Sequence, residues 1–205
     1  MIGLWVSCAI VVGVSRQLMP SMRPVWDSDK PKDVQPAEWV QKTSFTELKL
    51  MPKLRCASAF IVDNKAGEII FSQNADQVRP IASITKLLTS LVFLESGVDL
   101  NSTTRITNED AFGSSKSRLR PGEEYTVRDM LYAALVSSDN RAARALSRSA
   151  GMPQAKFIAR MNDKAKELGR DSTHVIEPTG LSDENRATAH DCAILVNAAL
   201  KNHLI

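Results

Sequence analysis

The most restrictive feature of this sequence is the segment 87–94, which is apolar on almost every side of a helix. Its large apolar side chains are Leu87, Leu88, Leu91, Val92, Phe93 and Leu94. A helix without a broad polar face is usually buried inside a domain, whereas a surface helix has one apolar and one polar side. The segment is therefore expected to form an internal helix that the rest of the chain must cover.

Two polar residues, Ser83 and Lys86, stand at the head of this segment, one helical turn apart. At this spacing two side chains share one face of a helix, with Cβ atoms about 5–6 Å apart, so the amine could take the proton of the hydroxyl. A buried lysine tends to lose its charge, and a neutral amine is the form that a general base needs. The pair is a candidate for nucleophilic catalysis, although a Ser-x-x-Lys spacing alone is common by chance.

Strands and loops are expected around this helix. Alternating, β-rich residues at 57–63 and 68–72, separated by a turn that ends at Gly67, predict a hairpin. The serine-lysine helix is expected to end near Gly97, a residue suited to a C-cap. The polar stretch 101–124 predicts a loop with short elements.

Helical patterns dominate the rest of the chain. Two of them follow a Thr-x-x-Asp capping box, and one has a proline in its first turn. Each continues with apolar residues at helical spacing. These four helices are expected to begin near Thr126, Asn140, Pro153 and Thr188.

The composition is that of an ordinary globular protein, with 43% hydrophobic and 24% charged residues. A net charge of +3, scattered basic residues and only 5% aromatic residues argue against nucleic acid as a partner. The three cysteines (Cys8, Cys56 and Cys192) are far apart, and the three histidines have no metal-ligand spacing with them. Neither a disulfide framework nor a zinc site is indicated.

The first 55 residues differ from the rest. Residues 1–16 contain an apolar run of the length of a secretory h-region, although no basic residue precedes it and no clear cleavage site follows. We interpret them as a signal-like or anchor segment and expect a periplasmic or other extracytoplasmic location, with a membrane tether if the segment is not cleaved. A lipoprotein site at Cys8 is disfavoured by a poor lead-in. Residues 17–55 contain five prolines and are expected to be a linker or arm, which leaves 56–205 for the domain.

A second motif, Ser138-Asp139-Asn140, lies between two predicted helices, where side chains can point out of the core. Ser-x-Asn alone is weak evidence, since Ser72 and Asn74 have the same spacing at a strand end. Ser-x-x-Lys followed by Ser-Asp-Asn is a stronger signal, because it opens the motif set of penicillin-recognising serine enzymes.

With both motifs in place, residues 56–203 resemble the low-molecular-mass penicillin-binding proteins of the D-alanyl-D-alanine carboxypeptidase and endopeptidase family. The segments Ser-Asp-Asn-Arg-Ala-Ala at 138–143 and Glu-Pro-Thr-Gly-Leu at 177–181 look most like the endopeptidase branch. The resemblance implies an α+β, β-lactamase- and transpeptidase-like fold, in which a helical cluster packs on an antiparallel sheet.

The resemblance also implies a role for each matching residue. Ser83 would be the nucleophile that forms an acyl-enzyme with a peptidoglycan stem peptide, and its own N–H would be one half of the oxyanion hole. Lys86 would be the base for acylation. Ser138 would pass the proton to the leaving amine, and the Asn140 amide would hold a carbonyl of the substrate. Asp139 is interpreted as a stabiliser of its loop.

For the segment 177–181 a structural role is favoured over a chemical one. The implied partners are peptidoglycan stem peptides as substrates and β-lactams as inhibitors. No cofactor and no metal ion are implied.

One family motif is missing from this sequence. The Lys-Thr-Gly segment expected downstream of Asn140 does not occur, and the chain is expected to lack the C-terminal strands that carry it. Without the second oxyanion donor and the carboxylate contact, we expect a poor or inactive catalyst. The hairpin would be a marginal two-stranded sheet with an open edge.

Three alternatives compete with a serine peptidase. A class A β-lactamase is disfavoured because its Glu-x-x-Leu-Asn segment does not occur here. A non-catalytic peptidoglycan-binding or regulatory remnant of the family stays open. A helical interaction protein that matches the motifs by chance is the least favoured.

Overall fold

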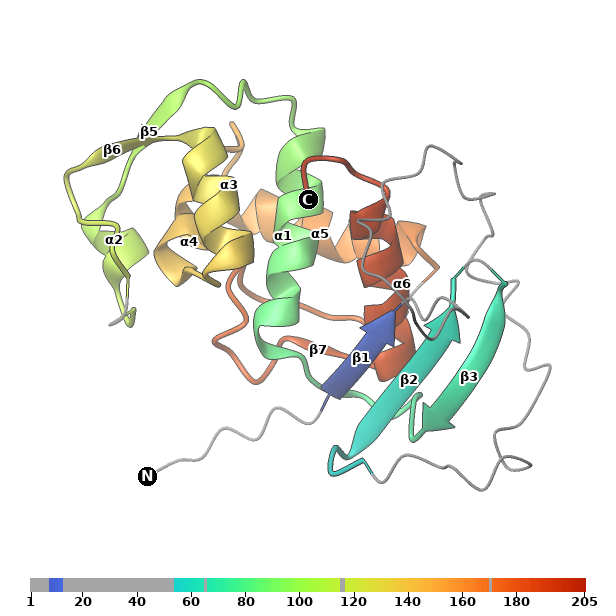
Figure 1. The fold of residues 1–205 in the computed structure, drawn as a ribbon. Coiled ribbons are helices and arrows are strands. Elements are labelled where there is room, and N and C mark those ends of the chain that lie inside the picture. Colours follow the sequence, from blue (N-terminus) through green and yellow to red (C-terminus); the bar gives the residue numbers. More distant parts are fainter. Residues whose placement is uncertain (1–7, 13–53, 65, 115–116, 170) are drawn as a thin grey trace, which may run out of the picture.

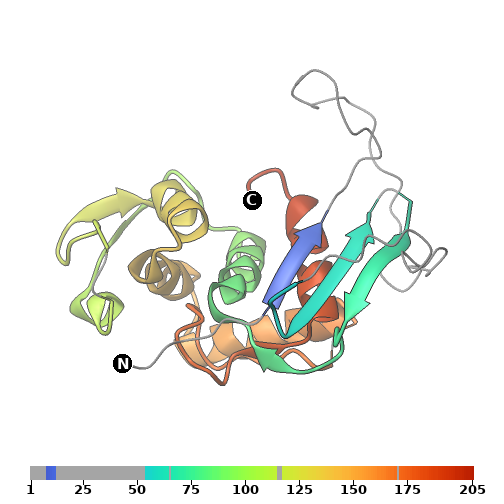
Figure 2. The same cartoon turned by 60° about the horizontal axis from the view of Figure 1, so that its bottom comes forward.

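A helical half lies beside a small β-sheet, with α6 (Ala189–Leu200) next to the sheet (Figures 1 and 2). Most of the expected signal-like segment 1–16 and linker 17–55 fall outside the described residues. In the part of the chain with described coordinates, no helix is both long enough and apolar enough to cross a membrane. The computed structural model describes residues 8–12, 54–64, 66–114, 117–169 and 171–205.

The predicted hairpin is confirmed, and a third strand extends it. Strands β2 (Ser58–Asp63) and β3 (Glu68–Gln73) pair antiparallel. Strand β1 (Cys8–Val12) pairs parallel with β2, in the order β1-β2-β3. The expected antiparallel pairing is present. The expectation that the hairpin stands alone as a two-stranded sheet is wrong, because β1 pairs along one edge of β2.

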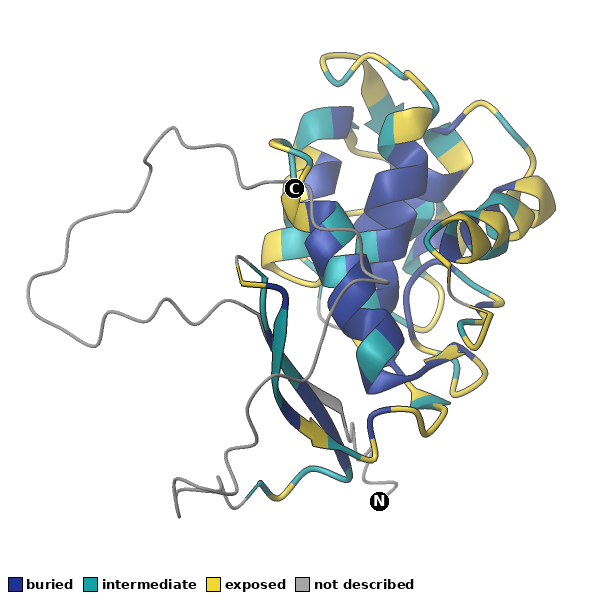
Figure 3. Cartoon of the chain, turned by 90° about the vertical axis from the view of Figure 1, so that its right-hand side faces the viewer, coloured by how far each residue is buried: buried dark blue, intermediate teal, exposed yellow. Residues whose placement is uncertain are grey.

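The apolar segment forms the buried centre of the helical half, as predicted. Helix α1 (Thr85–Glu95) contacts α3, α4, α5 and α6. Most of its residues are buried, as the colouring in Figure 3 shows. The helix begins later than the motif does, because Ala82–Ile84 form a separate 3₁₀ turn, η3. Ser83 therefore lies on a turn in front of α1, while Lys86 lies inside the helix.

The four predicted covering helices are present. The threonine hydroxyls at positions 126 and 188 accept from the N–H groups of Asp129 and Asp191, at 3.1 and 2.9 Å. The carboxylate of Asp129 accepts from the Thr126 hydroxyl, so this predicted capping box is only half formed. The bounds are α3 (Val127–Val136), α4 (Asn140–Ser149), α5 (Gln154–Glu167) and α6.

The expected loop with short elements between α1 and α3 is also present. A reciprocal capping box that the sequence analysis missed forms here, between Thr107 and Asp110. Outside this loop, β4 pairs antiparallel with β7, and one residue separates β4 from η3. The short elements are β4 (Arg79–Pro80), β5 (Thr103–Arg105), α2 (Asn108–Ala111), β6 (Glu124–Thr126) and β7 (Arg186–Ala187).

Candidate active site

Ser83 is exposed and lies on η3, directly before the N-terminal end of α1. The turn is anchored by Ile81, which is fully buried and accepts from the Ile84 N–H at 3.1 Å. Ala82, directly before the serine, has a φ of 42°. Non-glycine residues rarely adopt this conformation, and it is often found where a functional group must be presented.

Lys86 lies behind the serine with only 2% of its surface exposed. Its Nζ is 3.0 Å from the Ser83 Oγ and 2.7 Å from the Thr179 carbonyl oxygen. Burial lowers the pKa of Lys86 to about 8, although the charges of Glu177 and Asp139 raise it. The neutral amine is therefore accessible near physiological pH, within reach of the serine proton.

Ser138 completes a three-residue contact. It lies between α3 and α4 with a φ of 53°, and its Oγ is 2.8 Å from the Ser83 Oγ. The carboxylate of Asp139 accepts from the N–H groups of Arg141 and Ala142 and so caps α4. The sequence interpretation of Asp139 as a loop stabiliser agrees with this geometry.

Asn140, the predicted substrate-binding residue, is the first residue of α4 and is half-buried. Among the described residues its side-chain amide makes no hydrogen bond, either to Ser83 or to another residue. The structure thus brings Ser83, Lys86 and Ser138 together. Asn140 follows Ser138 by two residues along the chain and is not joined to this group by a hydrogen bond between described residues.

The sequence indicated a structural role for segment 177–181 but did not place it beside Lys86. In the structure residues 177–185, here named the 177–185 loop, form a wall of the site. Three polar side chains of α1 bond to it. Thr85 accepts from the Asn185 amide at 3.2 Å, and Thr89 donates to the Pro178 carbonyl at 2.8 Å. Between these two, Lys86 donates to Thr179. Buried polar residues in an otherwise apolar helix were the signal that could have predicted such a partner.

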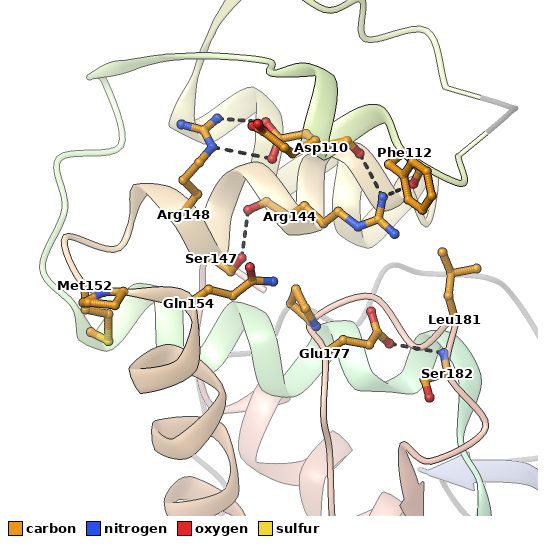
Figure 4. Close-up of a pocket in the computed structure, with 13 residues that line it drawn as sticks. Asp110, Phe112, Arg144, Ser147, Arg148, Met152, Gln154, Glu177, Leu181 and Ser182 are labelled. Carbon is orange, nitrogen blue, oxygen red and sulfur yellow. Dashed lines mark hydrogen bonds and ion pairs between the residues drawn. The ribbon is translucent and has the colours of Figure 1, made fainter.

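A cavity of about 790 Å³ borders the same loop on another side. Figure 4 shows Arg144 and Arg148 of α4 above it and Glu177, Leu181 and Ser182 below it. The arginines are already engaged: Arg148 pairs with the Asp110 carboxylate at 2.8 Å, and Arg144 donates to backbone carbonyls of α2 and its C-terminal end. In the described ranges, no three His, Cys, Asp or Glu side chains gather as a metal site.

The sequence is similar to known peptidases over most of its length. A family profile described as D-alanyl-D-alanine carboxypeptidase, peptidase S11, matches residues 44–205. A D-alanyl-D-alanine endopeptidase of Escherichia coli (strain K12) is 39% identical over 168 residues, which cover 81% of this chain and 54% of that protein. The D-alanyl-D-alanine carboxypeptidase DacF of Bacillus subtilis is 33% identical over 150 residues, or 70% of this chain and 39% of that protein. The chain spans about half the length of the endopeptidase relatives it matches.

Solved structures agree with the sequence comparison. A D-alanyl-D-alanine carboxypeptidase of Mycobacterium tuberculosis H37Rv superposes with a TM-score of 0.69 at 32% identity, over 84% of this chain and 62% of that chain. A variant of the Streptomyces K15 DD-transpeptidase superposes with a TM-score of 0.71 at 28% identity, over 75% and 64%. The expected transpeptidase-like α+β fold is thereby confirmed.

Proposed function

This chain belongs to the peptidase S11 family of D-alanyl-D-alanine carboxypeptidases, and from this premise we propose that it is a serine peptidase that acts on peptidoglycan stem peptides through an acyl-enzyme at Ser83. The observation that carries the proposal is the contact of three side chains: the Ser83 Oγ lies 3.0 Å from the Lys86 amine and 2.8 Å from the Ser138 hydroxyl. The proposed base and the proposed proton relay are thus each within hydrogen-bond reach of the proposed nucleophile.

The proposed reaction uses this geometry. The Ser83 oxygen attacks the carbonyl carbon of the penultimate D-alanine while its proton passes to the neutral Lys86 amine. The negative charge that develops on the carbonyl oxygen is stabilised by the Ser83 N–H. As the peptide C–N bond breaks, the proton reaches the leaving amine through Ser138. Water then hydrolyses the ester and returns the serine.

The names of the relatives favour cleavage of cross-links over removal of a terminal D-alanine. The three relatives at 39%, 39% and 37% identity are D-alanyl-D-alanine endopeptidases. The relative at 33% identity is a carboxypeptidase. A peptidoglycan substrate also requires export. The apolar composition of segment 1–16 is typical of a signal-like or anchor element, whereas the structure pairs residues 8–12 of this segment with β2 as strand β1, so export is proposed from the sequence alone.

Turnover by the 205-residue chain is proposed to be slow. The sequence contains no Lys-Thr-Gly segment after Asn140, so its residues supply one identified oxyanion donor. Loss of one such donor lowers turnover by about 10²–10³. A role in peptidoglycan binding without catalysis is the second candidate.

Labelling of the full chain with a fluorescent penicillin tests the proposal. We expect covalent labelling that Ser83→Ala abolishes, because the acyl bond forms on that oxygen. Ser72→Ala is the matched control, since Ser72 is exposed and belongs to the chance Ser-x-Asn match on β3. Labelling that persists in Ser83→Ala, or a parent chain that is never labelled, would contradict the acyl-enzyme. Retention of an unlabelled chain on purified sacculi would then support the binding role.

A further inference from the structure

The carboxylate of Glu177 accepts five hydrogen bonds from one short stretch of chain. Its Oε2 accepts from the Thr179 N–H at 2.8 Å and from the Thr179 hydroxyl at 2.5 Å. Its Oε1 accepts from the Gly180 N–H at 2.6 Å, the Asn185 amide at 2.9 Å and the Ser182 N–H at 3.4 Å. The last of these is drawn in Figure 4. A charged acceptor that gathers several backbone donors fixes the shape of the turn that carries them.

The turn that Glu177 holds is the one that contacts Lys86. Thr179 is 1% exposed, and its carbonyl oxygen accepts from the lysine at 2.7 Å. Because both the N–H and the hydroxyl of Thr179 are bonded to Glu177, the orientation of this residue depends on that carboxylate. The Thr179 carbonyl shares a planar peptide unit with the Gly180 N–H, which is also bonded to Glu177, so this carbonyl cannot turn away from the lysine without breaking that bond.

The contact to Thr179 determines how the amine faces the serine. A neutral lysine amine has two N–H groups and one lone pair. When one N–H points at the Thr179 carbonyl, the lone pair can be directed at the Ser83 hydroxyl, 3.0 Å from Nζ. A base acts only within such hydrogen-bond reach of the proton it removes.

Two carboxylates influence the charge of this lysine, from two different elements. Burial lowers the pKa of Lys86 to about 8, while the charge of Glu177 on the 177–185 loop and that of Asp139 at the start of α4 raise it. Its other neighbours, Ser83 and Thr179, are neutral. The orientation that Glu177 imposes favours Lys86 as the base. The negative charge of Glu177 has the opposite effect, because it raises the pKa of Lys86 and so opposes loss of the proton from its ammonium group.

We propose that Glu177 is a positioning residue for the acylation step, which holds the 177–182 turn so that the Thr179 carbonyl aligns the Lys86 amine with Ser83. The proposal rests on the proposed function and adds a residue outside its two motifs. In the described part of the chain no hydrogen bond joins Glu177 to Ser83, so Glu177 acts through the turn that it holds and through its charge.

The test measures the rate of penicillin acylation against pH in the full chain. Glu177→Gln replaces an acceptor oxygen with an NH₂ group that meets N–H donors, so we expect the plateau rate to fall about 10- to 100-fold, as for a small misplacement of a reacting group. The acid midpoint, which is the pH at which the acylation rate reaches half of its plateau, should be lower in this variant than in the parent chain. The reason is that one negative charge that raises the pKa of Lys86 is lost. The control Glu184→Gln removes an exposed carboxylate from the same loop and should change neither quantity.

A second variant separates geometry from charge. Thr179→Val removes the hydroxyl bonded to Glu177 and keeps the carboxylate, so the plateau should fall while the midpoint stays. A parent-like plateau in both variants would overturn the proposal. If Glu177→Gln does not fold by circular dichroism, the plateau of Thr179→Val decides.

A readout without turnover distinguishes failure of this inference from failure of the proposed function. If the parent chain is not acylated at all, the proposed function fails. The NMR titration of the Lys86 side chain in the parent chain and in Glu177→Gln then still applies. A lower titration midpoint in the variant supports the coupling between Glu177 and Lys86, and an unchanged midpoint overturns it.

Discussion

At Gly180 the backbone of the 177–185 loop lies against the peptide unit between Ala82 and Ser83. A Cβ at position 180 would lie 1.8 Å from the Ala82 carbonyl oxygen and 2.9 Å from the Ser83 nitrogen. The glycine also has a φ of 81°, which other residues rarely adopt. Ala82 itself is held at a φ of 42°. The loop thus braces, by direct backbone contact, the strained residue that precedes Ser83, the proposed nucleophile.

Two glycine substitutions separate this contact from the general cost of a positive φ. Gly97 has a φ of 71°, and a Cβ at this position would meet no heavy atom within 4 Å, so Gly97→Ala should cost about 1–2 kcal/mol of unfolding free energy. Gly180→Ala should cost about 1–3 kcal/mol more, because backbone atoms must move. It should also slow labelling of Ser83, which Gly97→Ala should not. Urea unfolding and penicillin labelling check both, and equal effects of the two variants would contradict the bracing role.

At the scale of elements, α1 shows what its pattern could predict and what it could not. Its apolar residues predicted a buried helix, and the helix is buried. The partners of Thr85 and Thr89 lie 100 and 89 residues further along the chain. Local periodicity carries no information about such pairing, so the sequence indicated only a structural role for the loop beside the lysine.

The sheet also combines a feature that the sequence predicts with one that it does not. The hairpin was predictable because alternation and a turn glycine are local signals. The parallel pairing of β1 with β2 joins Cys8 to Ser58 across a long stretch of chain, so no local signal specifies it. Ser83, Lys86 and Ser138 were predicted from two short motifs, whereas their distances required the packing of α1 against α3 and α4.

The start of α4 supplies a prediction for an element boundary. Asp139 caps the helix through the N–H groups of Arg141 and Ala142, directly after the strained Ser138. Asp139→Ala should cost about 1 kcal/mol of stability through the lost cap, and it should slow acylation because Ser138 is held less firmly.

A conservative replacement at the same position serves as the matched control. Asparagine caps helices about as well as aspartate, so Asp139→Asn should keep the unfolding free energy. Because the charge of Asp139 raises the pKa of Lys86, the acid midpoint of acylation should move to lower pH in both variants. A midpoint that stays at the parent value in Asp139→Asn would refute the electrostatic part, and unchanged stability in Asp139→Ala would refute the cap.

At the scale of the whole molecule there are two hydrophobic clusters among the described residues, and α6 contributes to both. The larger one surrounds α1 and includes Cys192, Leu195 and Ala199 of α6. The smaller one lies between the sheet and α6 and consists of Phe60, Val62, Ala75, Ala189, Ala193 and Ile194. Three of these six described residues are alanines, which bury little apolar surface each. The sheet is therefore expected to open more readily than the helical half, and the Ser83 site lies in that helical half.

Adjacent residues of α6 test this division. Ile194 and Leu195 are 1% and 6% exposed and belong to the smaller and the larger cluster, so Ile194→Ala and Leu195→Ala should each cost about 2–5 kcal/mol. In native-state hydrogen exchange, Ile194→Ala should speed exchange in β2 and β3 while α1 stays protected and Ser83 is still labelled. Leu195→Ala should reduce protection in α1 and slow labelling. Equal loss of protection in sheet and helix by both variants would mean that the two clusters unfold as one cooperative unit, since α6 would then transmit the opening of either cluster to the other.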